Sequence, residues 1–132
     1  MREGSTEPKW LTREILDAMH DAQLREHGGS GGVRDEGLLD SALNRPRNKF
    51  AYGETDLAVL AAAYAFGVAK NHGYVDGNKR AAFTAAALFL AMNDRELEAP
   101  EPEVVEIMNR LASGKLSEAA FAAWLGQHAA IP

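Results

Sequence analysis

The chain has 132 residues, of which 46% are apolar and 25% are charged, and these values are typical of one globular domain. It contains no cysteine, which excludes disulfide scaffolds, cysteine-based metal sites and thiol nucleophiles, and fits a cytoplasmic protein. The net charge of −5 argues against direct DNA binding, which requires a basic surface. The apolar runs are too short to span a membrane, and the N-terminus does not have the apolar core of a secretory signal.

The charge is distributed unevenly along the chain. Residues 45–80 carry six cations and three anions, a net of +3, whereas the remainder carries a net of −8. A local positive region on an acidic protein favours a compact anionic ligand over a long polyanion. A chance fluctuation among few charges is the alternative interpretation.

Helical spacing of apolar residues predicts a first helix within residues 11–27, ended by Gly28. The following "HGGSGG" is expected to be a flexible loop. It is not a dinucleotide-binding turn, because its glycines do not have the required spacing. A short second helix is predicted to begin at the capping residue Asp35 and to stop before Pro46.

Residues 44–52 show no helical period. Phe50 and Tyr52 alternate around Ala51, and Gly53 closes the run. This pattern predicts a small extended flap.

Two strongly apolar helices are predicted next, over residues 57–71 and 78–93, and both should be buried in the centre of the domain. Thr55 or Asp56 is expected to cap the first of them. Amphipathic helices follow over residues 101–114 and, capped by Ser117, within residues 116–130. We therefore expect a polar lead-in of residues 1–9 and one all-α domain of residues 10–128.

The stretch between the central helices, "NHGYVDGNKR", is unusually polar for its place. Gly73 is expected to end the first helix in the left-handed conformation, and Asn78 to cap the second. The first backbone N–H groups of the second helix have no helical acceptors and carry a partial positive charge. Because Gly77 allows close approach to the backbone, the pattern predicts an anion site at this helix terminus.

Lys79 and Arg80 support the anion site. Cations in the first turn of a helix cost roughly 0.3–1 kcal/mol each, because they oppose the helix dipole. Local stability would favour Asp or Glu in this turn, and a residue choice that opposes local stability points to a functional role. A bound phosphate would turn the repulsion into attraction, with Arg80 able to contact two oxygens and Lys79 acting as a point charge. Asp76 could then hold Mg²⁺ together with the oxygens of the bound phosphate.

His72 is the candidate general base, since histidine exchanges protons near neutral pH and could accept one from an attacking hydroxyl. Each residue of the stretch has an ordinary interpretation by itself: a helix end, a turn, a cap or solvated charges. Their combination between two buried helices favours a site. His20, His27 and His128 lack such neighbours in the sequence and are interpreted as surface or packing residues.

The stretch "HGYVDGNKR" resembles the signature H-P-F-x-[DE]-G-N-G-R-x-x-R of the Fic/Doc superfamily. The Doc-type (death-on-curing) toxins are more similar, because they have Lys in place of the last Gly. "GGVRDEGLLDSALNRPRNKFAYGE" also resembles the segment before the first central helix of these toxins. The resemblance covers about Trp10 to Gln127.

The resemblance implies a compact helical enzyme of a toxin–antitoxin pair that uses ATP and Mg²⁺ to modify a hydroxyl of a target protein. His72 would be the base, Asp76 the metal ligand, and Gly77, Asn78, Lys79 and Arg80 the nucleotide-binding residues. The target would be a Ser or Thr hydroxyl of elongation factor Tu, and the partner an antitoxin whose disordered C-terminal tail folds on binding. The target chain would add as a strand to the flap, at Arg47, Asn48, Lys49, Phe50, Ala51 and Tyr52.

Besides Lys79, three positions depart from the Fic signature. Gly73 replaces Pro, Tyr74 replaces Phe, and Phe83 stands where the second arginine would fall. The resemblance implies that the second arginine positions the triphosphate for nucleotidyl transfer, so its loss favours transfer of phosphate. A Fic-like adenylyltransferase and a non-catalytic module that binds an antitoxin or a nucleotide remain the alternatives.

Overall fold

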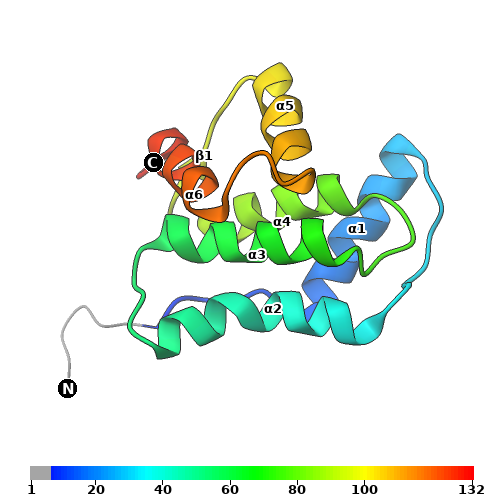
Figure 1. Ribbon diagram of the computed structural model, residues 1–132, viewed down its shortest axis with the longest axis horizontal. Coiled ribbons are helices and arrows are strands. Elements are labelled where there is room, and N and C mark those ends of the chain that lie inside the picture. Colours follow the sequence, from blue (N-terminus) through cyan, green and yellow to red (C-terminus); the bar gives the residue numbers. More distant parts are fainter. Residues whose placement is uncertain (1–6) are drawn as a thin grey trace.

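The computed structural model describes residues 7–132, which form six α-helices and one two-stranded sheet (Figure 1). The helices are α1 (Arg13–His27), α2 (Glu36–Ala51), α3 (Leu57–Asn71), α4 (Asn78–Met92), α5 (Glu101–Ala112) and α6 (Glu118–His128). The strands β1 (Glu96–Leu97) and β2 (Ala129–Ala130) pair antiparallel. The expectation of an all-α fold is confirmed.

Helix α3 forms the centre of the domain, with α2 and α4 packed along it (Figure 1). Ten of its 15 residues are buried, so no face is left for solvent over most of its length. Small side chains allow this close packing. A Cβ atom at Gly67 would lie only 2.9 Å from the Cα of Ala42 in α2. The two central helices predicted from the sequence are therefore confirmed, and the loop between them is held at one end of the domain.

Four helices begin with a side chain that accepts a hydrogen bond from their first turn. Thr12 caps α1, Asp35 caps α2, Asp56 caps α3 and Ser117 caps α6. Such caps stabilise a helix by about 1 kcal/mol. The predicted caps Asp35, Asp56 and Ser117 are thus confirmed.

The predicted flap at residues 44–52 is wrong, because α2 continues through Pro46 as far as Ala51. Proline inside a helix removes one hydrogen bond and is unfavourable. Here Pro46 is buried. The neighbouring Arg45 forms an ion pair with Glu118, and its guanidinium carbon lies 4.9 Å from the ring centre of Phe66. Tertiary packing therefore outweighs the local preference of proline, and the backbone of residues 44–51 has no free strand edge for a target chain.

The same segment also lies far from the polar stretch. It joins α2 to the beginning of α3, whereas His72 follows the end of α3, at the opposite end of the helix (Figure 1). A helix of 15 residues is about 22 Å long. The expectation that residues 47–52 dock a target strand beside the site is therefore not supported by the fold.

The part of the expected lead-in that the structure describes contacts the domain. The backbone N–H of Lys9 donates to Asn93 Oδ1 at 2.9 Å, and Asn93 Nδ2 donates to the carbonyl of Lys9 at 3.0 Å. Residues 1–6 of the lead-in lie outside the described residues. Within residues 7–132, no helix is both long and apolar enough to cross a membrane.

Candidate functional site

The end of α3 is formed by a left-handed residue, and this residue is His72. Its backbone angles are φ 51° and ψ 50°. We expected Gly73 to adopt this conformation, but Gly73 is needed for a different reason. A Cβ atom at Gly73 would lie 2.5 Å from two side-chain carbons of Leu39, because the first turn of α2 packs against the loop. The candidate base therefore has an exposed side chain on a strained backbone.

Asn78 closes the loop between α3 and α4. Its amide accepts a hydrogen bond from the backbone N–H of Tyr74 at 3.0 Å and donates to the carbonyl of Tyr74 at 3.0 Å. The expected N-cap role of Asn78 is wrong. Gly77, with φ 78°, occupies the cap position, and the buried Asn78 is the first helical residue. Its amide instead satisfies two polar groups of the buried Tyr74 backbone, which would be costly to leave unpaired.

The carboxylate of Asp76 is exposed and is held by two backbone N–H groups. Gly77 donates to Oδ1 at 2.8 Å, and Ser30 donates to Oδ2 at 3.2 Å. A Cβ atom at Gly29 would lie 2.9 Å from Oδ2, so the glycine-rich loop passes very close to this carboxylate. The "HGGSGG" segment is thus part of the site wall, although the sequence suggested only a flexible loop.

The buried imidazole of His20 supports the same loop from α1. Its Nε2 lies 2.7 Å from the carbonyl oxygen of Asp76, and its ring stacks on Tyr74 with the ring centres 3.7 Å apart. A packing role for His20 was expected, but its contact with the polar stretch was not. The sequence signal for it was weak: it is a polar residue one turn after Leu16, on the buried face of α1.

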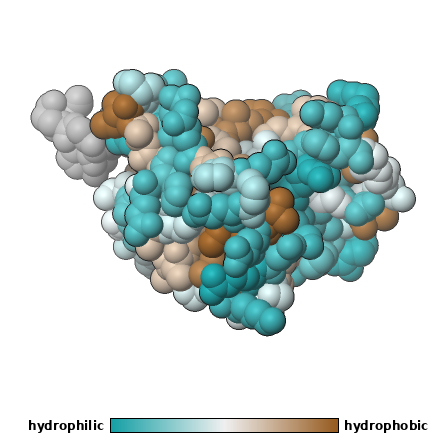
Figure 2. All heavy atoms as spheres, turned by 90° about the horizontal axis from the view of Figure 1, so that it is seen from above, coloured by the Kyte–Doolittle hydropathy of each residue, from teal (hydrophilic) through white to brown (hydrophobic). Residues whose placement is uncertain are grey.

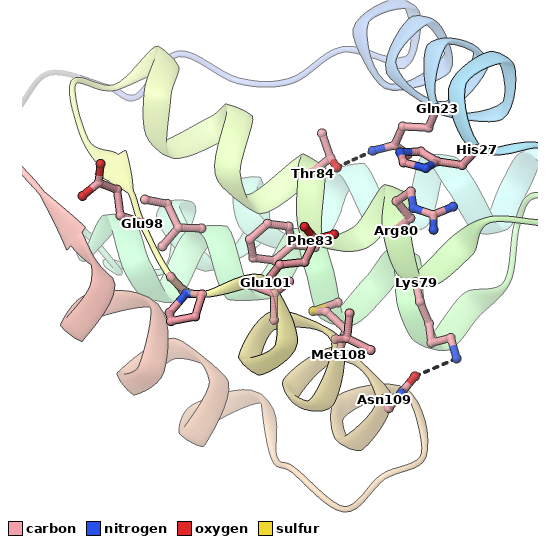
Figure 3. A pocket seen from close by; sticks show the side chains of 15 residues that line it. Gln23, His27, Lys79, Arg80, Phe83, Thr84, Glu98, Glu101, Met108 and Asn109 are labelled. Carbon is pink, nitrogen blue, oxygen red and sulfur yellow. Dashed lines mark hydrogen bonds between the residues drawn. The ribbon is translucent and has the colours of Figure 1, made fainter.

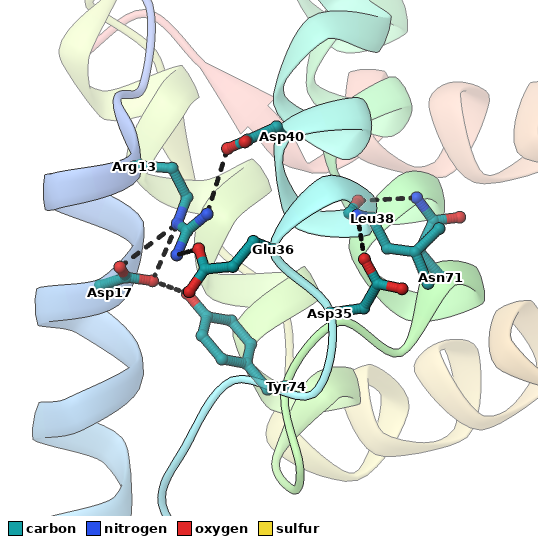
Figure 4. Close-up of polar contacts among 8 residues, drawn as sticks. All are labelled: Arg13, Asp17, Asp35, Glu36, Leu38, Asp40, Asn71 and Tyr74. Atoms are coloured by element: carbon teal, nitrogen blue, oxygen red, sulfur yellow. Dashed lines mark hydrogen bonds and ion pairs between the residues drawn. The ribbon is translucent and has the colours of Figure 1, made fainter.

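An ion-pair cluster lies beside the hydroxyl group of Tyr74 (Figure 4). Arg13 contacts Asp17 at 3.2 Å, Glu36 at 2.6 Å and Asp40 at 3.1 Å. Burial lowers the pKa of Arg13, but its hydrogen bond to Glu36 and its other acidic neighbours together raise the pKa above its ordinary value. Tyr74 donates to Asp17 at 2.5 Å, and burial together with this bond raises the pKa of Tyr74. The ion pairs of Arg13 connect α1 to α2, and the hydrogen bond of Tyr74 connects the loop to α1.

The N-terminus of α4 has the properties of an anion site. Its first helical hydrogen bond runs from Ala81 to the carbonyl of Gly77, so the N–H groups of residues 78–80 have no helical acceptors. The first turn contains no acidic residue, and Lys79 and Arg80 are exposed there. The Nζ of Lys79 donates to Asn109 Oδ1 in α5 at 2.8 Å (Figure 3). The predicted cations therefore lie at the unpaired helix end.

A pocket of about 1040 Å³ begins at these two cations and extends between α1, α4 and α5. Figure 3 shows Phe83 and Met108 inside it, with Arg80 near one end. Its further lining residues are Gln23, His27, Lys79, Thr84, Leu97, Glu98, Ala99, Pro100, Glu101, Val104, Val105 and Asn109. Figure 2, which shows the molecule from above, has small hydrophobic patches among hydrophilic residues on this face. His72 and Asp76 are outside this pocket, so the polar stretch and the apolar pocket meet only at Lys79 and Arg80.

Asp76 could hold Mg²⁺ only together with oxygen atoms of a bound phosphate compound. Within residues 7–132, no group of three or more histidine, aspartate or glutamate side chains could bind a metal ion. One fixed carboxylate combined with phosphate oxygens is, however, a common way in which proteins bind Mg²⁺. The exposed and immobilised oxygens of Asp76 fit this donor set.

Comparison with known proteins identifies the family of this chain. The model of the Fic/DOC family matches residues 10–90. The chain belongs to the Fic/DOC family. It is 34% identical over 108 residues to "Protein kinase doc" of Escherichia phage P1, covering 81% of this chain and 85% of that protein. It is 42% identical over 91 residues to "Toxin Doc" of Mycolicibacterium smegmatis, covering 65% of this chain and 69% of that protein.

Proposed function

We propose that this Fic/DOC protein is the toxin of a toxin–antitoxin pair and transfers the γ-phosphate of ATP to a Ser or Thr hydroxyl of elongation factor Tu. The observation that carries the proposal is the place of His72, Asp76, Lys79 and Arg80 on one short loop and helix end. The names "Protein kinase doc" and "Toxin Doc" of the two relatives support it. The choice of elongation factor Tu depends on the family resemblance, and we place the reaction in the cytoplasm, where this factor works.

In the proposed reaction the hydroxyl oxygen of the target attacks the γ-phosphorus. The bond between the γ-phosphorus and the β–γ bridging oxygen breaks, and ADP leaves with the electron pair. His72 accepts the proton of the attacking hydroxyl. Lys79, Arg80 and the free N–H groups of α4 stabilise the charge on the phosphate oxygens.

Asp76 would hold the Mg²⁺ that accompanies ATP. When bound, this ion neutralises charge on the phosphates and orients them for transfer. The protein's own contribution is the fixed direction of the carboxylate, since Ser30 and Gly77 each donate a backbone hydrogen bond to it. Asn78 would contribute its backbone N–H to the anion site, because its side chain is occupied by Tyr74.

Phe83 favours phosphoryl over adenylyl transfer. It lies in the pocket beside Met108, and its phenyl ring has neither a charge nor a hydrogen-bond donor for phosphate oxygens (Figure 3). A second arginine would otherwise stand at this position of the family signature. The available cations, Lys79 and Arg80, are both at the helix end, where they can balance charge on a transferring γ-phosphoryl group.

The antitoxin would bind the apolar part of the pocket between α4 and α5. Phe83, Val104 and Met108 line it, and Val105 at its edge is 54% exposed. An amphipathic segment that folds on binding is suited to such a groove. We expect Val105→Asp to abolish binding of the antitoxin encoded beside this protein. The matched control Ile131→Asp changes an exposed apolar residue outside the pocket and should still bind.

The reaction is tested with purified elongation factor Tu, ATP and Mg²⁺. Intact-mass analysis should show an adduct of the size of a phosphate, with release of ADP. Label should pass to the target from γ-labelled ATP and not from α-labelled ATP. Transfer of the α-label would overturn the kinase assignment in favour of adenylyl transfer, and absence of any adduct would favour a non-catalytic binding module.

A further inference from the structure

The guanidinium group of Arg34 lies at the end of α3. Its Nε donates to the carbonyl oxygen of His72 at 2.6 Å, and its Nη2 donates to the carbonyl oxygen of Asn71 at 2.8 Å. Carbonyl groups at the end of a helix lack helical donors and carry a partial negative charge. Arg34 therefore satisfies two of these acceptors with one planar, permanently charged group.

One of these two acceptors belongs to the candidate base. His72 is one of two non-glycine residues with positive φ among residues 7–132, and this conformation is unfavourable for a residue with a side chain. Such a conformation persists only where surrounding contacts hold it. The bond from Arg34 fixes the His72 carbonyl, and so it holds the peptide group that follows the Cα atom carrying the imidazole.

Arg34 is itself attached to a firm support. Its backbone N–H donates to the carbonyl of Gly73 at 2.7 Å, and the N–H of Asp35 donates to the same oxygen at 3.0 Å. In return, Asn71 Nδ2 donates to the carbonyl of Leu38 in α2 at 2.9 Å (Figure 4). The end of α3 and the beginning of α2 are thus joined on both sides of His72.

We infer that Arg34 is a positioning residue for His72. The inference deepens the proposed function and depends on the role of His72 as the base. Arg34 contacts the backbone of the base and none of the groups assigned to phosphate or metal binding, which lie at Asp76 and the beginning of α4. Its loss should therefore misplace the proton acceptor and leave the nucleotide site intact.

The test compares Arg34→Ala and Arg34→Lys with a matched control, Arg95→Ala. Arg95 also donates to the carbonyl of a residue with positive φ, since its Nη1 lies 3.1 Å from the oxygen of Asp94 (φ 65°). We expect Arg34→Ala to lower kcat roughly 10- to 100-fold, as small misplacements of catalytic groups do. KM for ATP should change less than about twofold. Arg34→Lys, which can reach one of the two carbonyls, should lie between, and Arg95→Ala should match the wild type.

Two further readouts separate positioning from loss of structure. Millimolar guanidinium should partly restore kcat of Arg34→Ala, and equal urea or sodium chloride should not. In NMR spectra without nucleotide, the His72 amide and imidazole signals should move in Arg34→Ala, while those of buried Phe89 and Leu125 stay in place.

Wild-type kcat in Arg34→Ala would overturn the inference, and so would a raised KM for ATP at unchanged kcat, which would make Arg34 a nucleotide-binding residue. If the wild-type protein transfers no phosphate at all, the proposed function fails by itself. The NMR comparison then still decides whether Arg34 holds His72 in place, and unchanged His72 signals would overturn that.

Discussion

The imidazole of His20 in α1 donates from Nε2 to the carbonyl oxygen of Asp76, 56 positions later in the chain, over 2.7 Å. The carbonyl can only accept, so Nε2 carries the hydrogen. The bond joins a buried helix residue to the backbone of the candidate metal ligand. The orientation of Asp76 is therefore set partly by α1, outside the polar stretch.

His20→Phe should preserve the stacking on Tyr74 and remove only the hydrogen bond to Asp76. A carbonyl that loses its donor inside a protein costs about 1–3 kcal/mol, so the free energy of unfolding should fall by that order. His20→Gln retains a donor and should lose less. Urea unfolding of the three proteins measures the difference, and equal stabilities of the Phe and Gln variants would contradict it.

His72→Asn should abolish transfer and leave the protein folded. Asparagine tolerates the left-handed conformation better than most residues, so this change removes the base without adding strain. Loss of a general base costs ~10²–10⁴-fold in rate. Transfer rate and melting temperature should be measured together, with His128→Ala in α6 as the control. Near-wild-type transfer by folded His72→Asn would remove His72 from the mechanism.

Asp76→Asn should raise the Mg²⁺ concentration needed for half-maximal transfer. The amide oxygen of asparagine can still accept the hydrogen bond from Gly77. Its NH₂ group would replace the oxygen that accepts from Ser30, and it cannot coordinate a metal ion. Stability should change little, because asparagine suits the same turn. A magnesium titration identical to that of the wild type would count against Asp76 as a metal ligand. Asp21→Asn, an exposed change on α1, is the control.

The features that could be predicted from the sequence are those that depend on neighbouring residues. Asp35, Asp56 and Ser117 each cap a helix by bonding an N–H two or three positions ahead, and the caps were found from the local pattern alone. The central helices were found for the same reason, since a continuous apolar run fixes both their length and their burial. The polar stretch was located because it interrupts these runs.

The features that were missed depend on contacts between distant residues. Residues after Pro46 are helical, and α2 is held there by contacts such as the pair of Arg45 with Glu118, 73 positions away. Ser30 reaches Asp76 across 46 positions, and Arg34 reaches His72 across 38. No periodicity or spacing in one sequence reports such pairs. The support of the candidate site was therefore invisible, although its polar residues were not.

Stability should fall at high pH because of Tyr64. Burial, opposed by the hydrogen bond from Leu11 and by Arg47, raises the pKa of Tyr64 from 10.0 to about 12. Between these values the unfolded chain loses a proton that the folded protein keeps. The free energy of unfolding therefore falls as pH rises, by about 2 kcal/mol at pH 12. Unfolding measured from pH 9 upward should show a smaller slope in Tyr64→Phe. Tyr52→Phe, which changes a tyrosine that is 93% exposed, should keep the wild-type slope.

The cations at the beginning of α4 should destabilise the protein when no ligand is bound. Lys79 and Arg80 oppose the helix dipole, and the first turn contains no acidic residue to balance them. Arg80→Ala should raise the free energy of unfolding by about 0.3–1 kcal/mol. Lys79→Ala should gain less, because it also loses the hydrogen bond to Asn109. Both variants should bind ATP more weakly than the wild type.

Arg110 provides the control of opposite sign, since it lies in the last turn of α5, where a cation is favourable. Arg110→Ala should therefore lower stability under the conditions in which Arg80→Ala raises it. Chemical unfolding in low salt measures both, and added salt should shrink both effects because exposed charges are screened. If Arg80→Ala is clearly less stable than the wild type without ligand, the side chain has a structural role. The argument that an anion compensates these charges would then be wrong.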